Sequence, residues 1–206
     1  MNLTPYFNQD TSRHMAGWYY FEQAFSEEEV QLIISIADFF PYIGARVHSQ
    51  EDGSTVSQYR RSNIKWLSAT DDANNSIRKT HWLYDRLMEY IAIANQEMWG
   101  FELHGLTDSI QYTEYDGSEE GHYDWHIDLG DDELSLRKIS LVVQMSDPED
   151  YEGGSLELNT GGPIVEPTKT KGSVIIFPSY LLHRVTPVTS GLRKSLVLWA
   201  GGSSLK

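Results

Sequence analysis

Short segments that alternate between apolar and polar residues fill the C-terminal half of the chain, and they constrain the fold more than any other feature. From Ile110 onward the segments are separated by Gly, Pro and Asp, which is typical of strands joined by turns. Because long loops but no helical pattern lie between them, the spacing predicts a mainly β fold, an antiparallel jelly roll or double-stranded β-helix. The expected strands are residues 110–115, 122–126, 137–144, 154–158, 163–167, 173–177, 183–186 and 193–200.

The N-terminal half has a helical pattern instead. Ser26 and Glu29 have the spacing of a capping box, and the apolar residues at positions 30, 33, 34 and 37 then share one helical face before Pro41. A second helix is expected over residues 75–98, with a glycine at position 100 as its stop signal. We expect these two helices to cover the outer face of one sheet, and residues 61–67 to form a further strand.

Nothing in the sequence separates two domains. The 206 residues contain no repeat and no linker rich in Gly, Pro or Ser, and a chain of this length buries roughly 70% of its unfolded surface. We therefore expect a single domain over residues 1–206, with helical support over about 1–105 and a jelly-roll core over about 106–202.

Composition narrows the functional classes. The chain has no cysteine, so disulfides, zinc–thiolate sites and cysteine nucleophiles are excluded, and any metal must be held by His, Asp or Glu. A net charge of −14 disfavours binding to nucleic acid or to an anionic membrane. The first residues lack the pattern of a secretory signal, and no apolar run is long enough to span a bilayer, so we expect a cytoplasmic protein.

The pattern His-x-Asp occurs twice within one alternating stretch, at His122–Asp124 and at His126–Asp128. In a strand, residues two apart point to the same face, so the pattern places an imidazole and a carboxylate side by side. A second histidine would complete the 2-His-1-carboxylate triad of non-haem Fe(II) enzymes, which leaves metal positions open for a cosubstrate and dioxygen. Since His-x-Asp alone is common by chance, the third ligand decides whether it indicates a metal site.

The end of the chain supplies the remaining groups. His183 lies ten residues before Arg193, and Ser195 follows two residues later on the same strand face. An Arg binds a carboxylate through two N–H groups, and a neighbouring hydroxyl can donate one more hydrogen bond. Alone, His183 would be interpreted as a buried core histidine and Arg193 as a solvated charge. Together with His-x-Asp they indicate an iron site that takes 2-oxoglutarate, whose distal carboxylate would meet Arg193.

At these residues the sequence resembles the Fe(II)- and 2-oxoglutarate-dependent dioxygenases, in particular the prolyl 4-hydroxylase-like group that includes the PKHD-type hydroxylases. That group has a Tyr, a Gly-bearing turn and then an aromatic residue three positions before His-x-Asp. The corresponding residues here are Tyr115, Gly117, Tyr123, His126 and Asp128. Residues 146–158 and 172–188 match as well, so the resemblance covers about residues 110–201.

The resemblance implies a metal site made of three residues. His126, Asp128 and His183 would be the iron ligands, because Tyr123 precedes His126 by three positions whereas Glu119 precedes His122. His122 and Asp124 would then be neighbours on the same strand face.

The resemblance also implies a cosubstrate site. Arg193 and Ser195 would bind the distal carboxylate of 2-oxoglutarate, with Tyr115 or its rival Tyr112 as a further contact. Some relatives use a Tyr on the third barrel strand for this purpose, but residues 140–146 contain none.

The implied reaction consumes Fe(II)-bound dioxygen and 2-oxoglutarate, releases succinate and carbon dioxide, and hydroxylates a C–H bond, with ascorbate as a supporting reductant. Asp128 favours hydroxylation over halogenation, since related halogenases lack this carboxylate. The expected substrate is a proline in a flexible peptide or protein chain, over which residues 49–60 and 128–136 would close. A solvated loop is the alternative interpretation of residues 128–136, and the oligomeric state is left open.

Three other functions stay open at this point. A hydroxylase of a free amino acid or metabolite would share every motif above. A nucleic-acid demethylase is disfavoured, because only 16 Lys and Arg residues are spread through the chain. A non-catalytic jelly-roll binding module would be expected to lose a triad residue or Arg193, and all four are present.

Overall fold

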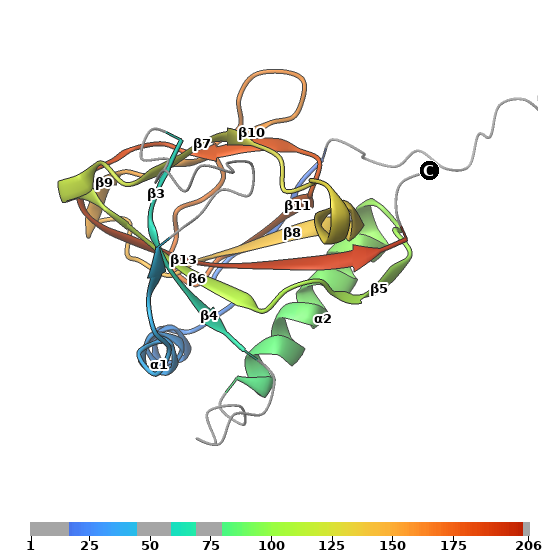
Figure 1. Cartoon of the computed structure of the whole chain (residues 1–206), viewed down its shortest axis with the longest axis horizontal. Coiled ribbons are helices and arrows are strands. Elements are labelled where there is room, and N and C mark those ends of the chain that lie inside the picture. The colour runs from blue at the N-terminus through green and yellow to red at the C-terminus, as the bar shows by residue number, and fades with distance from the viewer. Residues whose placement is uncertain (1–16, 45–58, 69–79, 204–206) are drawn as a thin grey trace, which may run out of the picture.

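The computed structural model describes residues 17–44, 59–68 and 80–203 (Figure 1). These ranges contain two α-helices, α1 (Glu27–Ala37) and α2 (His81–Met98), and short 3-10 helices at residues 117–119 and 132–136. The strands are β1 (Tyr19–Phe21), β2 (Ile43–Gly44), β3 (Arg60–Arg61), β4 (Asn63–Leu67), β5 (Leu103–Leu106), β6 (Ile110–Asp116), β7 (His122–His126), β8 (Arg137–Gln144), β9 (Tyr151–Gly153), β10 (Leu156–Asn159), β11 (Val174–Pro178), β12 (Leu182–Val185) and β13 (Val188–Gly202).

The strands pair antiparallel in two sheets. The large sheet has the order β1-β11-β8-β13-β6-β4-β2, with β5 and β9 also paired to β13, and the small sheet has the order β10-β12-β7-β3. The two sheets lie in separate layers, with both helices beside the large one (Figure 1). The predicted jelly roll with flanking helices is therefore confirmed.

One predicted strand is wrong. Residues 163–167 form a largely exposed segment whose only pairing is an isolated bridge, in which Leu158 and Val165 exchange backbone hydrogen bonds of 2.8 and 2.9 Å. Pro163 and Pro167 have no N–H to donate, so the ladder cannot extend beyond the bridge. Sequence alternation also missed β1, β2, β5 and β9, because strands of two to four residues are too short to show it.

The first helix begins as predicted. The Ser26 hydroxyl accepts a hydrogen bond from the Glu29 N–H (3.2 Å), and the Glu29 carboxylate accepts one from the Ser26 N–H (2.9 Å), which completes the capping box. The expected start of the second helix near residue 75 lies outside the described residues, and α2 is described from His81. Within the described part of the chain, neither helix is long and apolar enough to cross a membrane.

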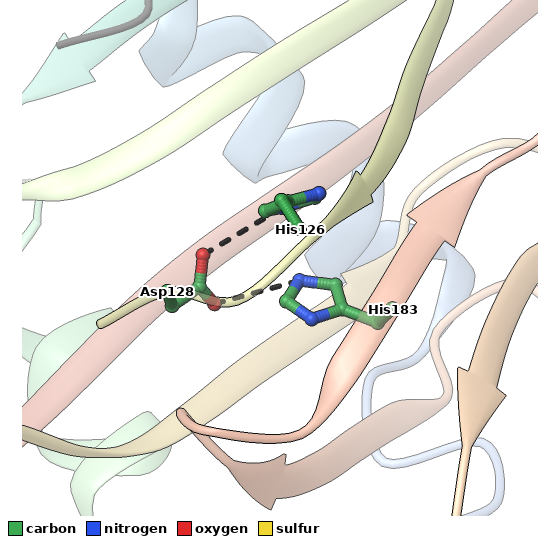
Figure 2. A group of neighbouring side chains, drawn as sticks. All are labelled: His126, Asp128 and His183. Carbon is green, nitrogen blue, oxygen red and sulfur yellow. Dashed lines mark ion pairs between the residues drawn. The ribbon is translucent and has the colours of Figure 1, made fainter. Parts of the chain in front are cut away.

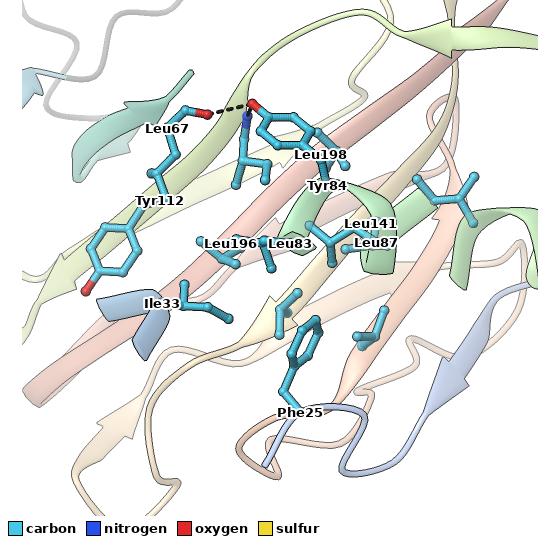
Figure 3. Packing of buried hydrophobic residues seen from close by; sticks show 14 of the residues in the cluster. Phe25, Ile33, Leu67, Leu83, Tyr84, Leu87, Tyr112, Leu141, Leu196 and Leu198 are labelled. Carbon is cyan, nitrogen blue, oxygen red and sulfur yellow. Dashed lines mark hydrogen bonds between the residues drawn. The ribbon is translucent and has the colours of Figure 1, made fainter. Parts of the chain in front are cut away.

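Alternating side chains give the large sheet two different faces. On the outer face, Leu141 of β8 and Leu196 of β13 are fully buried in a cluster with Ile33 of α1 and with Leu83 and Leu87 of α2 (Figure 3). On the inner face, toward the small sheet, the same two strands place several polar side chains. The helices thus hold an apolar core on one side of the sheet and leave the other side for a polar site.

This packing predicts unequal costs for two truncations on α2. Leu87→Ala should lower the free energy of unfolding by about 2–5 kcal/mol, because the residue is fully buried between the helix and the sheet. Ile93→Ala is the matched control: its residue is 39% exposed, and it should change stability by roughly 0.5 kcal/mol or less. Urea unfolding measures both, and equal losses would contradict this assignment of the helix faces.

Candidate metal centre

Three side chains with metal-ligand atoms meet where β7 ends. His126 is the last residue of β7, Asp128 follows two residues later, and His183 of β12 is the direct cross-strand partner of His126. The Asp128 carboxylate lies between the imidazoles (Figure 2), with Oδ1 3.7 Å from His126 Nε2 and Oδ2 3.6 Å from His183 Nε2. Their ligand atoms all lie within 4.8 Å of one another. The predicted triad is therefore brought together.

Main-chain hydrogen bonds fix which nitrogen of each imidazole is available. Nδ1 of His126 lies 2.7 Å from the Asp124 carbonyl oxygen, and Nδ1 of His183 lies 2.8 Å from the Leu181 carbonyl oxygen. A carbonyl oxygen only accepts, so Nδ1 carries the proton and Nε2 keeps a lone pair directed at Asp128. Burial, with the nearby His183, lowers the pKa of His126 to about 3, so its ring is neutral near pH 7. Two lone pairs and a carboxylate therefore converge on one point, which suits a metal cation.

A pair of serines supports the carboxylate. The Ser140 hydroxyl donates to Asp128 Oδ2 (2.6 Å) and lies 3.0 Å from the Ser179 hydroxyl, while the Asp128 N–H donates to the Ser179 carbonyl (2.8 Å). Burial alone would raise the pKa of Asp128, but His183, His126 and the Ser140 hydrogen bond outweigh it and lower the pKa. The carboxylate is thus ionised and oriented. Sequence reasoning missed both serines: Ser140 lies at an inner position of β8, and Ser179 lies in the turn directly after β11.

A bulge in β7 decides between the two His-x-Asp copies. His126 pairs with His183, but Tyr123 pairs with Val185, so three steps along β7 match two along β12. The extra residue places Tyr123 and His126 on the same face, where their rings stack with centroids 3.5 Å apart.

The other His-x-Asp copy lies outside the cavity as a result. The expectation that His122 and Asp124 share the face of His126 is wrong, because the bulge changes the phase of the alternation. His122 Nδ1 contacts the Glu120 carbonyl, and the Asp124 carboxylate accepts from the N–H of the next residue. The contact of Asp124 with His126 is made by its backbone carbonyl, which lies 2.7 Å from Nδ1 of the imidazole.

The triad opens into a cavity of about 680 Å³ between the two sheets. Both sheets and the segment that follows Asp128 contribute side chains to its wall. The lining residues are Arg60, Trp66, Thr107, Asp108, Gln111, Tyr115, Tyr123, His126, Asp128, Asp131, Asp132, Glu133, Leu134, Arg137, Val142, Leu156, His183, Val185, Arg193, Ser195, Val197 and Trp199.

Arg193 is a buried cation in this wall. Its residue is 1% exposed, and among the described residues no carboxylate forms an ion pair with it. Nη2 donates to the Gln144 side-chain oxygen (3.0 Å), Nη1 lies 3.5 Å from the Ser195 hydroxyl, and Nε is buried without a hydrogen-bond partner in the described part of the chain. Since an unpaired buried charge is costly, the site suits a ligand carboxylate.

The two candidate tyrosines lie on opposite faces of β6. Tyr115 lines the cavity, and the Arg193 guanidinium lies 5.4 Å from its ring centroid. Tyr112 belongs to the helix-side core, and its hydroxyl donates to Glu114 (3.2 Å). The structure therefore does not bring Tyr112 to the cosubstrate site, because residues three apart in a regular strand face opposite ways.

The segment after Asp128 lies at the cavity, as the sequence suggested. Arg137 follows this segment directly, and its guanidinium donates to the Asp108 carboxylate (2.9 and 3.0 Å) and to the Asp128 carbonyl (3.3 Å). The same guanidinium lies 3.9 Å from the centroid of the Trp199 ring. Sequence reasoning missed Arg137, Asp108 and Trp199. Of the other expected loop, 49–60, residues 49–58 lie outside the described residues.

The C-terminal half of the chain matches the model of a known family. Residues 110–201 match the model of the 2OG-Fe(II) oxygenase superfamily. The chain is similar to the PKHD-type hydroxylase of Colwellia psychrerythraea, 45% identical over 82 residues that cover 38% of this chain and 37% of that protein. It is also similar to the PKHD-type hydroxylase HEAR3399 of Herminiimonas arsenicoxydans, 36% identical over 94 residues, 43% of this chain and 41% of that protein. The matched part thus spans about two fifths of these relatives.

Solved structures share the fold over most of the chain. A prolyl hydroxylase of Trichoplax adhaerens, in complex with a hypoxia inducible factor peptide fragment, has a TM-score of 0.72 at 16% identity and covers 90% of this chain and 84% of that one. A Pseudomonas putida prolyl-4-hydroxylase has a TM-score of 0.67 at 19% identity, covering 91% and 94%. At these identities the likeness establishes the fold alone.

The Ser140 contact predicts a measurable effect on metal affinity. Ser140→Ala should weaken Mn(II) binding about tenfold or more, because the Asp128 carboxylate loses the hydroxyl that orients it. Ser35→Ala, an exposed position on α1, is the matched control and should leave the affinity unchanged. Isothermal titration of the metal-free proteins gives both values, and equal affinities for all three proteins would rule out the supporting role of Ser140.

Proposed function

We propose that this protein is an Fe(II)- and 2-oxoglutarate-dependent dioxygenase that hydroxylates a C–H bond, because residues 110–201 match the model of the 2OG-Fe(II) oxygenase superfamily. One observation carries the proposal: a single cavity contains a two-histidine, one-carboxylate cluster and, in its wall, the buried guanidinium of Arg193, which has no ion-pair partner among the described residues. The cluster suits a cation and Arg193 suits an anion, and the pair matches a metal-bound 2-oxo acid with a distal carboxylate.

The residues divide into two binding sets. His126, Asp128 and His183 would hold Fe(II) and leave its other positions open. Arg193 and Ser195 would hold the distal carboxylate of 2-oxoglutarate. When bound, the iron and the cosubstrate supply the oxidising chemistry, in which dioxygen converts a C–H bond into C–OH with release of succinate and carbon dioxide. Asp128 fills the position that related halogenases leave to a halide, which favours hydroxylation.

The other wall residues orient the site and shield it from water. The Tyr123 ring stacks on His126, and the Arg60 guanidinium lies 4.6 Å from the Tyr123 centroid, so ring stacking holds the imidazole in addition to its main-chain contact. Arg137 links the backbone carbonyl of Asp128 to the carboxylate of Asp108. These contacts hold the carboxylate and one imidazole in place before any ligand arrives.

The proposed substrate is a proline in a flexible peptide or protein chain. Two facts support this class: the solved structures named above are prolyl hydroxylases, one of them bound to a peptide, and the related proteins are PKHD-type hydroxylases. A free amino acid is the second candidate, since Arg60 presents to the cavity region a buried Nη2 without a hydrogen-bond partner among the described residues, which a substrate carboxylate would satisfy.

Turnover separates these possibilities. Incubation with Fe(II), ascorbate and 2-oxoglutarate should release succinate, and mass spectrometry should find a gain of one oxygen on a proline of a peptide from a candidate panel. If free amino acids gained oxygen and no peptide did, the substrate would be a free amino acid and not a peptidyl proline. Absence of both succinate release and 2-oxoglutarate binding would refute the dioxygenase.

The assigned ligands predict which substitutions abolish turnover. His126→Ala, Asp128→Ala and His183→Ala should each remove activity, because each removes a metal ligand. His122→Ala and Asp124→Ala are the matched controls and should retain measurable activity, since both side chains lie outside the cavity and alanine keeps the Asp124 carbonyl. An inactive His122→Ala beside an active His126→Ala would reverse the assignment.

The cosubstrate site predicts a change in binding rather than in chemistry. Arg193→Ala should raise the KM for 2-oxoglutarate about tenfold or more with little change in iron affinity, because a charge-assisted pair in a shielded site is lost. Tyr112→Phe should leave that KM unchanged, as the hydroxyl lies on the helix side of β6. Steady-state kinetics at varied 2-oxoglutarate test both, and an unchanged KM for Arg193→Ala would remove it from the site.

A further inference from the structure

Gln144 is a buried amide beside Arg193. It is the last residue of β8, its residue is 1% exposed, and its side-chain oxygen accepts a hydrogen bond from Arg193 Nη2 (3.0 Å). Its side-chain nitrogen donates to the Thr168 carbonyl (3.1 Å). Because that carbonyl can only accept, the amide orientation is fixed, and its oxygen faces the guanidinium.

The surroundings hold the rest of the arginine side chain in one position. Gly154 lies against its aliphatic part, where an added Cβ would come within 2.9 Å of Arg193 Cδ. The Tyr115 ring lies on another side, 5.4 Å from the guanidinium carbon. The packing therefore leaves the guanidinium little freedom, and the Gln144 hydrogen bond fixes one of its terminal nitrogens.

The neutrality of Gln144 matters as much as its hydrogen bond. A guanidinium has five N–H donors. In the described structure Gln144 accepts from one at 3.0 Å, the Ser195 hydroxyl lies 3.5 Å from another nitrogen, and the Tyr151 side chain also hydrogen-bonds with the guanidinium. A carboxylate at position 144 would form a bidentate ion pair with Arg193 and neutralise its charge. An amide of the same size orients the guanidinium and leaves both its charge and its other donors for a ligand.

We propose that Gln144 is a positioning residue for the cosubstrate: it holds Arg193 as an uncompensated cation that receives the distal carboxylate of 2-oxoglutarate. The inference rests on the proposed function and adds a residue that touches neither the metal nor the open part of the cavity. A purely structural role would instead make Gln144 matter for stability and not for cosubstrate affinity.

Direct binding tests this role without turnover. The dissociation constant of 2-oxoglutarate is measured by isothermal titration on the full chain saturated with Mn(II), together with the Mn(II) affinity itself. Gln144→Glu should weaken 2-oxoglutarate binding at least about tenfold, because the new carboxylate competes for Arg193. Gln144→Leu should weaken it by a smaller factor, about threefold to tenfold, through loss of the orienting hydrogen bond. Mn(II) affinity should stay unchanged in both variants.

Two further variants complete the experiment. Gln96→Glu makes the same chemical change at an exposed position of α2 and should bind 2-oxoglutarate as the wild type does, which controls for added charge. In the Arg193→Ala background, the proteins with Gln144 and with Gln144→Glu should bind 2-oxoglutarate with the same low affinity. If Gln144→Glu fails to fold, as judged by thermal unfolding, Gln144→Leu decides the question.

The possible outcomes distinguish a failure of the role of Gln144 from a failure of the proposed dioxygenase function. A wild-type protein that binds no 2-oxoglutarate would overturn the proposed function. Tight binding by the wild type, weak binding by Arg193→Ala and wild-type affinity in both Gln144 variants would leave the proposed function intact and overturn the role of Gln144. Loss of Mn(II) affinity in step with loss of 2-oxoglutarate affinity would also overturn it, by showing a general structural effect.

Discussion

Side-chain alternation on β8 and β13 determines both the core and the site of this protein. One set of side chains is apolar and packs against α1 and α2. The other set includes Ser140, Gln144, Arg193 and Ser195, which could not be buried against a helix without large desolvation costs. Because these residues alternate along two hydrogen-bonded neighbouring strands, the packing that stabilises the sheet also places the polar groups inside the jelly roll. Fold and site are therefore two consequences of one pattern.

Inside the jelly roll, the metal cluster and Arg193 each lack an oppositely charged partner, so each suits a ligand of opposite charge. The metal cluster contains a carboxylate facing two imidazole lone pairs, and Arg193 provides a cation with no acidic partner among the described residues. The two groups do not neutralise each other, because each is held by its own hydrogen bonds: Ser140 holds Asp128, and Gln144 holds Arg193. A divalent cation and a dicarboxylate would satisfy both sets of groups.

Much of this could be predicted from sequence, because period-two alternation and the His-x-Asp spacing are local. The jelly roll, the capping box and the two candidate His-x-Asp pairs follow from such patterns, and the resemblance to the dioxygenases implied the choice of His126 and Asp128. What could not be predicted depends on contacts between distant segments. The bulge that turns His122 and Asp124 out of the cavity appears only in the pairing of β7 with β12.

The residues that support Asp128 and Arg193 could not be predicted for the same reason. Ser140 and Gln144 are ordinary strand residues until β8 is seen beside Asp128 and Arg193. Alternation places Tyr112 and Tyr115 on opposite faces of the predicted strand, but only the packing of the sheet shows that Tyr115 is the one that faces the cavity. The strand predicted at 163–167 failed because alternation was counted without regard to the missing N–H groups of its two prolines.

Anaerobic titration of the Fe(II)-loaded protein with 2-oxoglutarate, followed by visible absorption, tests whether one cavity holds both the iron and the cosubstrate. A 2-oxo acid that chelates iron through its carboxylate and keto oxygen gives a charge-transfer band, so chelation is seen without turnover or a known substrate. We expect a band that saturates at one 2-oxoglutarate per chain and is absent from Asp128→Ala. A folded, iron-loaded wild-type protein that gives no band would rule out the proposed iron and cosubstrate site.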